Sequence, residues 1–150
     1  MNHTAYKYDI PVVNRHVFTS MGKKRIEKVV EFSGIGLKDT FNLGFGDLLP
    51  DGTIDDLANS NNGDIAKVLV TIIGIIKDFT NKNPRAHIIF TGSTKERTDL
   101  YSRILRSYYS SFIEEFSISG FLKVGDRYKV VPFDPDMDLD YPFYLIKRIL

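Results

Sequence analysis

The clearest pattern in the chain is a run of apolar residues at helical spacing between residues 64 and 81. The run follows the i, i+3, i+4, i+7 spacing of one helix face and comprises Ile65, Val68, Leu69, Ile72, Ile73, Ile76 and Phe79. Val70 and Ile75 widen this apolar surface, so we expect the helix to be covered on more than one side. Asn61 or Asn62 is its expected N-cap, and Pro84 follows its end.

A second helical pattern begins after Gly92. Its apolar face comprises Tyr101, Ile104, Leu105, Tyr108 and Phe112. Because charged and polar side chains fall on the opposite face, the pattern predicts a long amphipathic helix that starts near Ser93. Immediately before it, residues 88–90 form a short apolar run of the kind found in a strand buried on both faces. These residues therefore predict a strand, a glycine turn and a helix in succession.

Shorter apolar segments, bounded by turn residues, predict strands in the remaining chain. They lie within residues 6–32, 40–47, 86–90, 118–124, 127–133 and 141–149. The Gly125-Asp126 step predicts a hairpin turn between two of them. Because strands come first, then helix, strand, helix and more strands, we expect an α+β fold, with a mainly antiparallel, curved sheet of about six or seven strands packed on two long helices. The length favours a single globular domain over residues 1–150.

Two details of the strand pattern leave alternatives open. Within residues 40–47, Gly44 and Gly46 fall on the face opposite the aromatic residues, which indicates a close approach by another backbone or a ligand, or a bend in the strand. The densest basic run comprises Lys23, Lys24, Arg25 and Lys28. This run suits either contact with a phosphate backbone or protection of an edge strand by lysines, and we prefer the edge strand.

Composition removes several classes of protein. A net charge of +1 gives no overall attraction to nucleic acid or acidic membranes. The absence of cysteine excludes disulfides, thiolate nucleophiles and zinc–thiolate or iron–sulfur centres. Residues 1–8 lack the apolar core of a signal peptide, and the most apolar segment, residues 68–76, is shorter than the roughly 20 residues that span a bilayer. We therefore expect a cytoplasmic protein with no membrane partner.

Neither the histidines nor the aspartates predict a metal site. Alternating aspartates near the end of the sequence resemble the start of a calcium-binding EF-hand loop, and they are Asp134, Asp136, Asp138 and Asp140. Positions six and twelve of such a loop require glycine and glutamate, but here they are Leu139 and Leu145. We therefore predict no metal and no cofactor.

The turn after residues 88–90, with the first residues of the second helix, forms the candidate site. Ser93 precedes Glu96 by three residues, the spacing of a capping box in which each side chain satisfies a backbone N–H of the other residue. Arg97 projects along the same line as the apolar face of the helix, where an unpaired charge is costly. Arg97 therefore needs a partner, which is either a bound anion or an acidic residue of the chain.

In the first interpretation, this segment binds an anion at a helix N-terminus, where backbone N–H groups and the helix dipole favour negative charge. The residues assigned to this ligand site are Gly92, Ser93, Thr94, Lys95, Arg97 and Tyr101. Arg97 would clamp the anion with bidentate geometry, and Tyr101 would offer a wall on which a base stacks. In the alternative, the helix is only capped and Arg97 forms an internal salt bridge. Helix caps far outnumber ligand sites, which favours this alternative.

Three motifs resemble those of an uncharacterised family of small bacterial proteins. They are Asn-Leu-Gly-Phe-Gly-Asp at residues 42–47, Ser-Asn-Asn-Gly-Asp at 60–64 followed by Lys67, Val68 and Leu69, and Gly-Ser-Thr at 92–94 followed by Arg97, Thr98, Leu100 and Tyr101. Residues 143–148 also fit, so the resemblance covers almost the whole chain. It implies a small bacterial cytosolic protein and brings no established activity with it.

Three hypotheses of function remain open. The leading one is a binding module for a phosphate-bearing ligand, a nucleotide or a nucleic acid, at residues 92–97. The second is an enzyme that processes a nucleotide or nucleic acid, with His87 or Asp47 as general base and Arg97 as transition-state clamp. The third is a non-catalytic protein-interaction module or a homodimer. The sequence does not decide whether the protein is an enzyme.

Overall fold

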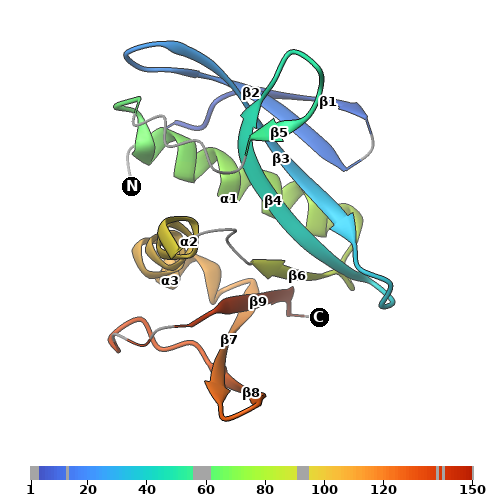
Figure 1. Cartoon of the computed structure of the whole chain (residues 1–150), viewed down its shortest axis with the longest axis vertical. Helices are drawn as coiled ribbons and strands as arrows, with labels where there is room; N and C mark the ends of the chain where they lie inside the picture. The colour runs from blue at the N-terminus through green and yellow to red at the C-terminus, as the bar shows by residue number, and fades with distance from the viewer. Residues whose placement is uncertain are drawn as a thin grey trace. The chain divides into compact units, whose positions relative to one another are not determined.

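The computed structural model of the chain describes residues 4–12, 14–55, 62–90, 95–137, 139 and 141–149. These residues contain nine strands and three helices, which confirms the α+β class and the mainly antiparallel pairing (Figure 1). The expected counts of six or seven strands and two long helices are wrong. The chain divides into two compact units, residues 1–33 with 44–83 and residues 34–43 with 84–150. The single domain stays a prediction.

The first unit combines antiparallel strands with one long helix. Its elements are β1 (Tyr8–Val12), β2 (Arg15–Met21), β3 (Arg25–Gly34), the second part of β4 (Thr40–Leu48), β5 (Ile54–Asp55) and α1 (Ile65–Lys82). β2 pairs with β1 and with β3, and β4 pairs with β5. In Figure 1, α1 runs behind these strands, and the rings of Phe32 and Phe79 stack at 3.9 Å between β3 and α1. The helix predicted over residues 64–81 is confirmed as α1.

The second unit contains β6 (His87–Phe90), a strand paired on both edges. Residues 40–43 of β4 pair with β6 in parallel, and β9 (Phe143–Arg148) pairs with its other edge in antiparallel. Beyond β9 lie β7 (Phe116–Val124) and β8 (Arg127–Pro132), both antiparallel to their neighbours. Gly125, with φ of 61°, forms the predicted turn between β7 and β8.

The second predicted helix is divided in the structure. α2 (Lys95–Ser107) and the short α3 (Tyr109–Phe112) are separated at Tyr108, whose backbone angles of φ −116° and ψ 18° lie outside the α-helical region. The apolar side chains still face inward as the spacing predicts, since Ile104, Leu105 and Phe112 are buried. No helix in the described ranges has the length and apolar character needed to cross a membrane.

Candidate functional site

The predicted site lies where the chain passes from β6 to α2. β6 ends at Phe90, which is fully buried, and α2 begins at Lys95, so only four residues separate a buried strand from a helix of 13 residues. The strand and helix that flank the site are therefore present. Gly92, Ser93 and Thr94 lie outside the described residues, and so does the side chain of Arg97.

The two remaining predicted residues differ sharply in accessibility. The side chain of Lys95 is 74% exposed, and its amine lies 3.2 Å from the carboxylate of Asp99 one turn later. Tyr101 is only 2% exposed, and its ring packs 5.3 Å from that of Phe90, so it belongs to the core of the second unit. Lys95 can therefore meet an approaching anion, whereas Tyr101 presents no open ring face on which a base could stack.

The positions of the two candidate general bases, His87 and Asp47, do not support a catalytic role for either. His87 is the first residue of β6, and its backbone N–H donates to the carbonyl of Asp39 at 2.7 Å. The predicted site follows Phe90 in sequence, and Phe90 is at the opposite end of this strand, about 10 Å from His87 at the usual rise per residue. Asp47 belongs to the first unit, where its carboxylate accepts a hydrogen bond from the Lys28 amine.

The position of Lys28 shows that the preferred interpretation of the basic run, an edge strand protected by lysines, is wrong. β3 lies between β2 and β4, so it is not an edge strand, and Lys28 is only 5% exposed. Its ion pair with Asp47 joins β3 to β4 inside the first unit. The cost of removing this charge from water is offset by a carboxylate at hydrogen-bond distance.

A second polar cluster, missed in the sequence, surrounds Asp64 at the start of α1. The hydroxyls of Ser20 and Tyr6 donate to the same carboxylate oxygen of Asp64 at 2.5 and 2.6 Å. Burial alone would raise the pKa of Asp64, but these hydrogen bonds and the positive charge of Lys28 hold the pKa below its usual 3.8. Burial and the Asp64 carboxylate raise the pKa of Tyr6. We name Tyr6, Ser20, Asn62 and Asp64 the Asp64 cluster.

Asn62 ties this cluster to the β2–β3 turn. Its side-chain amide donates to the Ser20 hydroxyl at 3.0 Å and to the Lys24 carbonyl at 2.7 Å, and its side-chain oxygen accepts from the Lys24 N–H at 2.7 Å. A Cβ at Gly22 would lie 1.8 Å from the Asn62 carbonyl oxygen, so only glycine fits there. The polar side-chain atoms of Asn62 already have hydrogen-bond partners within the protein. We therefore interpret the Asp64 cluster as a structural feature that joins the β2–β3 turn to the start of α1.

The motif at residues 60–64 was the sequence signal for this cluster, but Asn61 or Asn62 was predicted only as the N-cap of the helix that became α1. The N-cap of α1 is Asp64, and its side chain makes no capping hydrogen bond. One of its carboxylate oxygens instead accepts from the hydroxyls of Ser20 and Tyr6. Asn62, one of the two expected N-caps, instead binds the β2–β3 turn, and Asn61 lies outside the described residues. Within the described part of the chain, no group of three or more histidine, aspartate or glutamate residues could hold a metal ion.

Comparison with known proteins gives one match. Residues 2–149 match the profile of a protein family described as a family of unknown function, DUF6934. This match confirms the resemblance to an uncharacterised family. No curated protein and no solved structure matches the chain.

Proposed function

We propose, on the premise that the chain belongs to the family of unknown function DUF6934, that it is a small binding module for a phosphate-bearing ligand. The ligand is a nucleotide or a nucleic acid, and its phosphate meets the chain between the end of β6 and the first turn of α2. Gly92, Ser93, Thr94, Lys95 and Arg97 form the proposed contact.

One observation supports this proposal more than any other. The 13-residue helix α2 begins four residues after the buried end of β6, with the exposed Lys95 at its first position. The first N–H groups of a helix lack intrahelical partners and carry the positive end of the helix dipole, so they favour an anion. β6 is also parallel to residues 40–43 of β4, and ligands of α/β proteins gather at the carboxyl ends of parallel strands.

The charged side chains complete the proposed contact. Lys95 would add a positive charge, and its ammonium group has three N–H donors, so a phosphate can accept from it beside the Asp99 carboxylate. Arg97, two residues further into α2, would add a bidentate donor. The buried Tyr101 is removed from the proposed contact set, so recognition rests on the phosphate instead of on a stacked base.

An enzymatic role has no comparable support. His87 lies at the far end of β6 from the proposed contact, and the Asp47 carboxylate is paired with Lys28. A general base needs to lie within hydrogen-bond reach of the proton that it removes. Binding without chemistry is therefore the conclusion that we carry forward.

Thermal unfolding with inorganic phosphate, ATP, GTP and short single-stranded RNA tests the proposal. A ligand at one hundred times its dissociation constant adds about 2.7 kcal/mol to the free energy of unfolding. We expect at least one of these ligands to raise the melting temperature of the wild type. Arg97→Ala and Lys95→Ala should reduce the shift, whereas the matched control Arg103→Ala, on an exposed position of α2, should keep it.

Two results would overturn the proposal. The first is the absence of any shift in the wild type across the panel. The second is an equal loss of shift in Arg103→Ala, because general electrostatic attraction would then explain the binding. If Arg97→Ala unfolds, Lys95→Ala with its exposed side chain still provides the comparison.

A further inference from the structure

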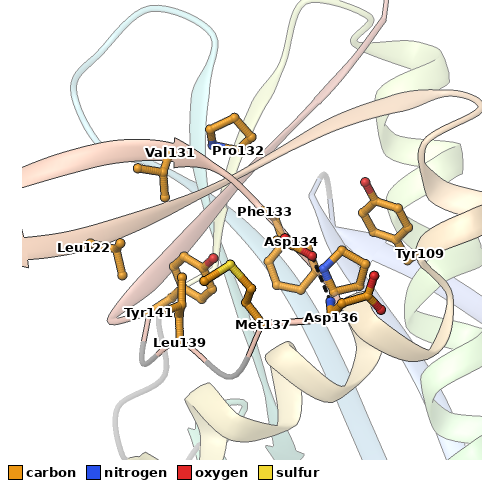
Figure 2. Close-up of a pocket in the computed structure, with 11 residues that line it drawn as sticks. Tyr109, Leu122, Val131, Pro132, Phe133, Asp134, Asp136, Met137, Leu139 and Tyr141 are labelled. Carbon is orange, nitrogen blue, oxygen red and sulfur yellow. Dashed lines mark hydrogen bonds between the residues drawn. The ribbon is translucent and has the colours of Figure 1, made fainter.

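A second candidate site lies entirely in the second unit, away from the β6–α2 connection in sequence and of opposite charge. It is a groove of about 580 Å³, formed by α3, β7, β8 and the segment that follows β8 (Figure 2). Its volume falls in the range of small-molecule sites, about 300–1,000 Å³. The side chains that matter below are Tyr109, Leu122, Phe133, Asp134, Asp136 and Tyr141.

Tyr141 supplies the observation that points to a ligand. The residue is 1% exposed, and its hydroxyl has no hydrogen-bond partner among the described residues. Its ring occupies the space over Gly120, where a Cβ would lie 2.2 Å from the ring. Figure 2 shows the hydroxyl turned inward among the lining side chains. Because a buried polar group without a partner is costly, a polar group that reaches this hydroxyl from the groove would supply the missing hydrogen bond.

The charged side chains at the groove select for positive charge. Asp134 is half-buried and Asp136 is exposed, and the described residues that line the groove include no lysine, arginine or histidine. The carboxylate of Asp134 also accepts the backbone N–H of Asp136 at 2.9 Å, which fixes the turn that carries both groups. Such a pair of carboxylates attracts an ammonium group and repels a phosphate or a carboxylate.

The interior of the groove is aromatic and apolar. The ring of Phe133 lies 6.1 Å from that of Tyr109 and 5.7 Å from that of Tyr141. Because Phe133 is only 4% exposed, the accessible walls are the half-buried side chains of Tyr109 and Leu122. Aromatic faces bind organic cations through their negative ring faces, and they also bind the apolar body of a ligand.

We propose that this groove binds a small hydroxyarylalkylamine, a ligand with an ammonium group at one end of an aromatic body and a hydroxyl at the other. The ammonium group meets Asp134 and Asp136, the ring packs against the half-buried side chains of Tyr109 and Leu122, and the hydroxyl forms a hydrogen bond with Tyr141. This site is independent of the phosphate contact at α2.

Calorimetric titration with three matched probes tests the assignment. Tyramine carries both polar ends, 2-phenylethylamine lacks the hydroxyl, and 3-(4-hydroxyphenyl)propanoate replaces the ammonium group by a carboxylate. We expect tyramine to bind most tightly, with 2-phenylethylamine weaker by roughly two- to tenfold for one lost hydrogen bond. The propanoate should bind weakest of the three.

Variants then assign each end of the ligand to its residue. Tyr141→Phe should abolish the preference for tyramine over 2-phenylethylamine, while Tyr128→Phe, on an exposed residue of β8, should keep it. Asp136→Asn should weaken both amines, whereas Asp126→Asn in the exposed β7–β8 turn should not. Asp136 is exposed, so its variant remains informative if Tyr141→Phe is poorly folded.

Three outcomes would overturn the proposal. They are no tyramine binding at 10 mM probe, propanoate binding as tight as amine binding, and an unchanged tyramine preference in a folded Tyr141→Phe variant. Binding of inorganic phosphate should be the same in the wild type and in every groove variant, which separates this test from that of the α2 contact.

Discussion

The hydroxyl of Ser20 donates a 2.5 Å hydrogen bond to the carboxylate of Asp64, a residue 44 positions later in the chain. This bond joins the end of β2 to the start of α1, and the hydroxyl of Tyr6 reaches the same carboxylate oxygen. A single acidic side chain thus holds three segments of the first unit together.

Replacement of Asp64 should therefore be costly. Asp64→Ala leaves the hydroxyls of Ser20 and Tyr6 without their acceptor, and we expect it to lower the free energy of unfolding by about 2–3 kcal/mol. Asp64→Asn keeps an acceptor oxygen and should cost less. Urea unfolding of both variants measures these changes, with Asp78→Ala on an exposed position of α1 as control. A loss as small as that of the control, within about 0.5 kcal/mol, would show that the cluster contributes little.

The two glycines of β4 give a matched pair of substitutions within one strand. A Cβ at Gly46 would lie 2.5 Å from the carbonyl oxygen of Asp55 in β5, whereas the nearest described atom to a Cβ at Gly44 is the Glu31 carbonyl oxygen, at 3.8 Å. We expect Gly46→Ala to cost about 1–3 kcal/mol through overpacking. Gly44→Ala should be neutral or slightly stabilising, because alanine restricts the unfolded chain. Equal effects of the two substitutions in chemical unfolding would contradict the close approach at Gly46.

His16 should make the first unit sensitive to mild acid. The side chain is 3% exposed between the rings of Tyr8 and Phe32. Burial, with a smaller effect from the positive charge of Lys82, lowers the pKa of His16 below its usual 6.5. The unfolded chain then binds this proton more readily than the folded chain. The resulting stability is fully present above pH 6.5 and is lost as the pH falls from 6.5 toward the lower folded pKa.

Unfolding of the wild type and of His16→Phe between pH 5 and pH 8 measures this effect. The difference in unfolding free energy should be constant above about pH 7 and should shift in favour of His16→Phe as the pH falls, by at most about 1.4 kcal/mol per pH unit for one proton. A difference that stays constant over the whole range would mean that His16 accepts its proton equally well in both states.

The local pattern of apolar, polar and turn residues correctly predicted several helices and strands of this chain. The helix α1, the strands β6 and β9 and the β7–β8 hairpin lie within two residues of their predicted bounds. Each has either a sustained apolar period or a turn signal on both sides, and these depend only on neighbouring residues. The division at Tyr108 was missed because the apolar face continues across it.

Such local patterns could not predict contacts between residues that are distant in sequence. Lys28 and Asp47 are 19 residues apart, and no periodicity marks them as a buried pair. The parallel pairing of β4 with β6 likewise depends on the fold as a whole. For the candidate site, the sequence located the flanking strand and the exposed Lys95, but it assigned Tyr101 to a ligand when the packing of Phe90 requires it in the core.

The position of β9 sets an order of events during synthesis. β9 pairs with β6 on one side and with β7 on the other, yet it is translated after both. At about 5–20 residues per second, β6 waits roughly 3–11 s for this partner. The residues of the first unit, by contrast, are all translated once residue 83 is reached. The nascent chain therefore passes through an interval in which the edges of β6 and β7 that β9 later covers are unpaired, and unpaired strand edges favour aggregation.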